Sequence, residues 1–157
     1  MVASPHTGLV LVFDVGPVRF GLPMERVDEV VRAVALQQLP GAPAVVAGAF
    51  VLRGEIIPLF DLRARFGLEA QPLHPSQRFI VASARSRRVA LRADAMDWIR
   101  EVDGTKVREP ATIVRGVDRI RGVAQLEDAL VLIQDLDAFL DDAESAALDR
   151  ALEPGGT

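Results

Sequence analysis

Cysteine and tyrosine are absent from this chain of 157 residues, and histidine occurs only twice. Without cysteine the chain has no disulfide framework, no thiolate metal site and no thiol chemistry. His6 and His74 have no serine or carboxylate at the spacing of a known catalytic motif, which argues against a Ser-His-Asp arrangement. The phosphate-binding patterns GxxxxGKS/T and GxGxxG and the zinc pattern HExxH are also missing. These absences predict a protein that is not an enzyme and needs no cofactor.

Basic residues are not in excess, since the formal net charge is −4. Seven acidic residues and one basic residue lie after position 134, so the rest of the chain carries 17 basic and 15 acidic residues. A nearly neutral body lacks the basic face that attracts a phosphate backbone. We therefore expect no nucleic acid among the partners.

Two groups of carboxylates are close enough in the sequence to share a divalent cation. They are Asp94 with Asp97, and Asp141 with Asp142 and Glu144. Helix caps and a solvated acidic face explain these residues more simply, because short acidic motifs often match by chance. We predict no metal site.

An uncharged run at residues 33–52 is long enough to cross a bilayer. Its glutamines, prolines and glycine prevent a single apolar helix. The N-terminal residues MVASPHTG lack the basic and apolar regions of a signal peptide. The sequence therefore predicts a soluble, cytoplasmic protein without direct membrane insertion.

Short apolar runs separated by turns of polar, charged or glycine residues predict β-hairpins. They lie at residues 9–22, 44–60, 79–92 and 122–133. In the second hairpin, residues 55–60 are apolar on both faces, as in a strand between two packed layers. Pro58 has no N–H for a ladder, which predicts that this strand lies at an edge or at a barrel seam.

The segment after the first hairpin is open to two interpretations. Met24, Val27 and Val30 follow helical spacing, which predicts a short helix. The β-branched residues at 30–36 fit a strand equally well. Residues 94–99 repeat the pattern and are predicted to repeat the helix.

Two further helices are predicted. Asp61 is a suitable N-cap for a short helix that Gly67 ends. Apolar residues at 139–152 recur at helical spacing opposite an acidic face. This pattern is typical of an amphipathic helix at the C-terminus.

These elements occur twice along the chain. The offset between matching residues grows from 66 at Phe13 and Phe79 to 74 at Asp61 and Asp135, as two homologous halves with insertions in the second would produce. We predict a mainly β fold in a single domain, residues 1–157. Its lobes are expected at roughly 9–70 and 78–140, followed by a helix at roughly 142–153.

The order of these motifs resembles the CheW-like domain, the adaptor module of bacterial chemosensory arrays. The resemblance covers roughly residues 9–140. Its motifs are Val27-Asp28-Glu29-Val30, Leu39-Pro40, the run 48–54 that ends in Leu52-Arg53-Gly54, and the run 56–63 with the letters IIPLFDLR. The resemblance implies two five-stranded, SH3-like β-barrel lobes packed together.

The resemblance also implies a function and two partners. The chain would couple the cytoplasmic domain of methyl-accepting chemoreceptors to the regulatory domain of a sensor histidine kinase. One alternative is an accessory protein that binds receptors only, because Val51 replaces the family's usual asparagine and the loop at 103–118 does not match the family. A more remote alternative is an enzyme or small-ligand carrier that uses the seam between the lobes.

Arg53, in the turn between two strands, is the first candidate for partner binding. An arginine in a turn can make a bidentate contact with a partner's carboxylate. The ordinary alternative is a solvated arginine, or a salt bridge to Glu55. Gly54 and Val51 flank it in the same motif.

Glu29 matches the family's acidic position and is the second candidate. Its alternative is a helix-surface pair with Arg26 or Arg32. Val27 and Val30 complete the predicted site, with a mixed role in core and interface.

Overall fold

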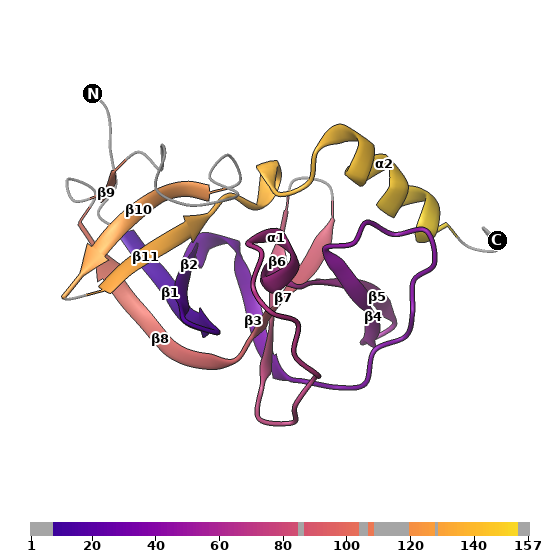
Figure 1. Cartoon of the computed structure of the whole chain (residues 1–157), viewed down its shortest axis with the longest axis horizontal. Coiled ribbons are helices and arrows are strands. Elements are labelled where there is room, and N and C mark those ends of the chain that lie inside the picture. Colours follow the sequence, from indigo (N-terminus) through magenta and orange to yellow (C-terminus); the bar gives the residue numbers. More distant parts are fainter. Residues whose placement is uncertain (1–7, 85–86, 104–106, 109–119, 128, 154–157) are drawn as a thin grey trace.

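Two β-sheets and a few short helices make up the fold (Figure 1). The computed structural model describes residues 8–84, 87–103, 107–108, 120–127 and 129–153. His6 and most of the loop at 103–118 lie outside the described residues. The mainly β fold class predicted from the sequence is confirmed.

The two sheets are named here by their number of strands. The six-stranded sheet contains, in spatial order, β8 (Ala95–Val102), β1 (Gly8–Val15), β2 (Val18–Pro23), β11 (Ala129–Gln134), β10 (Ile120–Leu126) and β9 (Val107–Arg108). The five-stranded sheet contains β3 (Val27–Arg32), β6 (Arg78–Ser83), β7 (Arg88–Ala93), β5 (Glu55–Phe60) and β4 (Val46–Leu52). The helical elements are η1 (Met24–Arg26), α1 (Leu62–Arg65), η4 (Leu136–Ala138) and α2 (Asp142–Ala151). Within the described residues both sheets are open, not closed barrels.

The repeat seen in the sequence is present, but the first hairpin of each half pairs with strands of the other half. Hairpin β1–β2 lies in the six-stranded sheet with β8, β10 and β11, and hairpin β6–β7 lies in the five-stranded sheet with β3, β4 and β5. The lobes expected at 9–70 and 78–140 therefore do not coincide with the sheets. Apolar patterning identifies strands and their buried faces, but it does not specify which distant strand each one pairs with.

Both segments predicted as a helix after a first hairpin are strands instead. Apart from the single turn η1, residues 24–31 form β3, and residues 95–99 belong to β8. The pairing of β3 with β6 shifts between Val27 and Glu29, so one extra residue bulges there. The bulge lets Val27 and Val30 pack on the same core, and this spacing of three imitates a helix.

Pro58 lies in an interior strand, not at an edge, since β5 has β4 on one side and β7 on the other. The parallel pairing of β5 with β7 begins at Leu59, one residue after the proline. The predicted cap at Asp61 is confirmed, because its side chain accepts a hydrogen bond from the Arg63 N–H at 3.0 Å.

Between the sheets lies the largest apolar core, to which both halves contribute. Phe60 of β5 stacks on Phe139, which follows η4, with ring centroids 4.8 Å apart. Phe20 of β2 meets Phe66, which follows α1, at 5.0 Å. Helix α2 begins with a reciprocal capping box between Asp141 and Glu144. It lies beside β4 and β5 (Figure 1).

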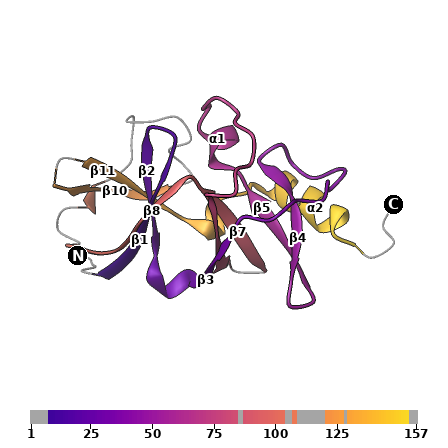
Figure 2. The same cartoon turned by 90° about the horizontal axis from the view of Figure 1, so that it is seen from below.

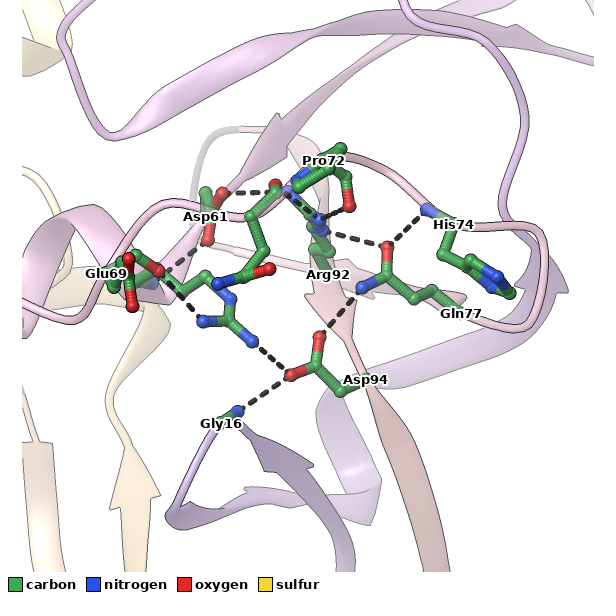
Figure 3. A network of polar contacts seen from close by, with 10 residues as sticks. Gly16, Asp61, Glu69, Pro72, His74, Gln77, Arg92 and Asp94 are labelled. Carbon is green, nitrogen blue, oxygen red and sulfur yellow. Dashed lines mark hydrogen bonds and ion pairs between the residues drawn. The ribbon is translucent and has the colours of Figure 1, made fainter.

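A partly buried polar network ties the two sheets together (Figure 3). Asp94, between β7 and β8, accepts hydrogen bonds from the Gly16 N–H at 2.7 Å and from Gln77 at 2.9 Å, and it also pairs with Arg63. Arg92, only 5% exposed, donates to the Gln77 side chain and to Asp61. Because both Asp94 oxygens are engaged by donors, this carboxylate is structural.

Candidate protein-docking site

The turn between β4 and β5 presents Arg53 at the tip of a hairpin. Arg53 and Gly54 have φ angles of 47° and 85°, so both central residues of the turn lie in the left-handed region. This is the geometry of a type I′ hairpin turn, which favours glycine at the second position. The Arg53 side chain is 65% exposed.

Arg53 pairs with Glu29 of β3, although the two residues are 24 positions apart. The alternative partner Glu55 is instead bound by another arginine. The alternative of a Glu29–Arg26 pair is also not realised, because Arg26 donates to Asp137 at 2.7 Å, a contact that raises the pKa of Arg26. The structure thus brings together the two charged residues singled out in the sequence. Both β3 and the β4–β5 hairpin tip lie on the lower side of Figure 2.

Arg88, at the start of β7, joins this pair to two further carboxylates. Its guanidinium lies 3.1 Å from Glu55, 3.2 Å from Asp28 and 3.8 Å from Glu29. We call Arg53, Glu29, Arg88, Asp28 and Glu55 the charged cluster. Three carboxylates and two guanidinium groups give it a formal charge of −1.

Beside the charged cluster lies an exposed apolar pair. Val51 of β4 and Ile56 of β5 are opposite one another in register and are 63% and 54% exposed. An open hollow of about 330 Å³ is lined by both residues and by Leu152, which follows α2. An exposed apolar pair beside a hollow and an exposed arginine makes this surface a candidate for protein docking.

Of the six predicted site residues, four gather at this hairpin tip: Arg53, Gly54, Glu29 and Val51. Val27 and Val30 do not join them, because both are half-buried and pack on the central core. Whether the four bind a partner stays a prediction.

Sequence reasoning missed Arg88, Asp28 and Ile56. The internal repeat carried a signal for two of them. Asp28 matches Asp97 and Arg88 matches Arg19, and Arg19 again lies near its aspartate, at 3.7 Å. An ion pair preserved in both halves could have marked these positions.

The acidic residues and His74 were the other candidates for chemistry in the sequence. Among the described residues, no group of three or more His, Cys, Asp or Glu side chains is placed to hold a metal ion. His74 Nδ1 lies 2.8 Å from the Ser76 hydroxyl, but the same nitrogen accepts the Ser76 N–H at 3.0 Å, so the contact closes a local turn. No helix in the described part of the chain has the length and apolar character to span a membrane.

Comparison with known proteins gives consistent matches. The family model of the CheW-like domain matches residues 9–144. "Chemotaxis protein CheW" of Rhizobium meliloti is 30% identical over 140 residues, which cover 88% of this chain and 90% of that protein. The protein of the same name from Helicobacter pylori is 26% identical over 129 residues, with 82% and 78% covered. The crystal structure of the scaffolding protein TtCheW from Thermoanaerobacter tengcongensis superposes with a TM-score of 0.80 at 25% identity, covering 90% of this chain and 92% of that one.

Proposed function

The chain belongs to the CheW-like domain family, and from this membership we propose that it is a non-enzymatic adaptor of a bacterial chemosensory array. In this role it couples the cytoplasmic tip of methyl-accepting chemoreceptors to the regulatory domain of a sensor histidine kinase. The relatives named as chemotaxis proteins and the structural neighbour named as a scaffolding protein support the role.

The observation that carries the receptor half of this proposal is the hairpin tip. A chemoreceptor tip would be a helical hairpin, and helices dock by laying an apolar stripe on an apolar surface. Val51 and Ile56 supply such a surface. Arg53 next to them supplies a charge that can bind a carboxylate of the partner at the edge of the contact.

The test is Arg53→Ala. We expect the affinity for a purified chemoreceptor cytoplasmic fragment to fall roughly 30-fold, the equivalent of about 2 kcal/mol at a binding hot spot. The melting temperature should stay nearly unchanged, because an exposed ion pair contributes little to stability. Isothermal titration calorimetry measures the affinity.

Arg32→Ala is the matched control, since Arg32 is an exposed arginine at the other end of β3. Its affinity should equal that of the unmodified chain. An unchanged affinity in Arg53→Ala, or a large fall in its melting temperature, would contradict the proposed site. A parallel titration with the kinase regulatory domain separates a full coupling protein from an accessory protein that binds receptors only.

A further inference from the structure

Glu29 has two arginines beside it, and both approach the same oxygen. Arg53 donates to Oε2 of Glu29, and Nη2 of Arg88 lies 3.8 Å from that atom. The Arg88 contact is longer than a hydrogen bond, so Arg88 lies close to Glu29 without donating a hydrogen bond to it.

The two arginines are held very differently. The side chain of Arg53 is 65% exposed and pairs with Glu29. That of Arg88 is 33% exposed and is placed by Glu55 at 3.1 Å and Asp28 at 3.2 Å. Arg53 therefore has freedom to turn outwards, while the two carboxylates hold Arg88 close to Glu29.

The charges in the cluster make Arg88 necessary for such a movement. If Arg53 turned from Glu29 to a carboxylate on another protein, the Glu29 carboxylate would lose its ion pair. It would remain near the carboxylates of Asp28 and Glu55. Like charges left close together oppose the movement. A shift of about 1 Å brings Arg88 within ordinary hydrogen-bond reach of Glu29.

We propose that Arg88 is a positioning residue for partner recognition, which takes over Glu29 when Arg53 turns to a carboxylate of the docking protein. This inference rests on the proposed function and specifies its chemistry. The docking segment presents an acidic side chain to Arg53 and apolar side chains to Val51 and Ile56. No proton or covalent bond changes place, since only ion pairs are exchanged.

A double-mutant cycle tests the proposal, with affinity for the chemoreceptor cytoplasmic fragment as the readout. Arg88→Met removes the charge and keeps an apolar stem, so Glu29 retains Arg53 more tightly. We expect binding about tenfold weaker, a coupling of the size measured between residues of one ion-pair network. In the Glu29→Gln background there is no carboxylate to hold Arg53, so Arg88→Met should change the affinity less than about twofold.

A purely structural role for Arg88 predicts a different result. It would weaken binding by the same factor in both backgrounds, or lower the melting temperature along with the affinity, and either result overturns the proposal. Arg88→Lys provides a folded variant that keeps the charge, and its affinity should lie between those of Arg88→Met and the unmodified chain. An Arg88→Lys variant as weak as Arg88→Met would also overturn it.

Failure of this inference is distinguishable from failure of the proposed function. If Arg53→Ala weakens binding and the Arg88 cycle shows no coupling, the docking site stands and the role of Arg88 falls. If Arg53→Ala binds the fragment as tightly as the unmodified chain, both fall.

Discussion

In the five-stranded sheet the edge strand β3 bulges at Asp28, and in the six-stranded sheet the edge strand β8 bulges at Asp97. Each bulged aspartate faces an arginine at the start of the second strand of a first hairpin, Arg88 in one sheet and Arg19 in the other. The two ends therefore share a backbone plan and one ion pair.

Their surfaces differ in the residues around that shared plan. The position of Glu29 in β3 is taken by Trp98 in β8, which is 53% exposed and has a φ of 65°. The turn residue Arg53 is matched by Glu127, which lies 3.5 Å from Arg100. One tip thus carries a cation and the other an anion. The comparison teaches that a duplicated framework can keep its pairing geometry while each copy presents different chemistry to a partner.

The largest expected effect comes from Asp94→Ala, which removes the carboxylate at the centre of the polar network between the two sheets. The variant leaves the buried Arg63 guanidinium without its carboxylate, and we expect a loss of about 3 kcal/mol in the free energy of unfolding. Urea denaturation measures this loss. Asp97→Ala is the control, because its more exposed pairs predict a loss below about 1 kcal/mol. Similar losses in the two variants would show that the network does not tie the sheets.

A smaller effect is expected from Gly21, which matches Ala90 in the other sheet. A Cβ at Gly21 would lie 2.6 Å from Cγ1 of Val10 and 3.0 Å from Cγ1 of Val131. Gly21→Ala should therefore cost about 2 kcal/mol through overpacking. Ala90→Gly should cost about 1 kcal/mol, since it only removes a methyl group and loosens the strand. Thermal unfolding measures the stability of both variants. A Gly21→Ala variant as stable as the unmodified chain would mean that the six-stranded sheet accepts a methyl group at this position, as the five-stranded sheet does at Ala90.

The smallest effect is expected from Glu127→Ala, the counterpart of Arg53→Ala. Its pair with Arg100 is exposed, so the melting temperature should hardly change. Binding of the chemoreceptor fragment should not change, because the proposed docking site lies at the other sheet. The same calorimetric titration measures it, and a loss as large as that of Arg53→Ala would show that both tips contact the receptor.

Local features of the fold could be predicted from the sequence. Glycine and proline mark the turns, and Asp61 and Asp135 cap matching short helices because an aspartate side chain can accept a hydrogen bond from the second N–H after it. The C-terminal helix, Asp142–Ala151, follows from its apolar spacing. These features depend on residues that are close in the chain.

Features that depend on distant pairing could not be predicted. The bulge at Asp28 made a strand imitate a helix, and only the partner strand reveals it. The pairing of Arg53 with Glu29, and the place of Arg88 beside them, follow from how β3, β5 and β7 assemble. Charge and spacing alone offered several partners for Glu29, and the family resemblance identified the residue without its partner.

The crossing of the two halves has a consequence for how the molecule could be divided. Since β1–β2 completes a sheet begun by the second half, and β6–β7 completes one begun by the first, neither half owns a whole sheet. A single backbone cut in the exposed connector near Ser76 would leave two interlocked fragments, held by strand ladders and not by a hinge. Each fragment made alone would contain strands that lack their hydrogen-bonding partner strands. The two fragments would therefore have to be produced together to form a working protein.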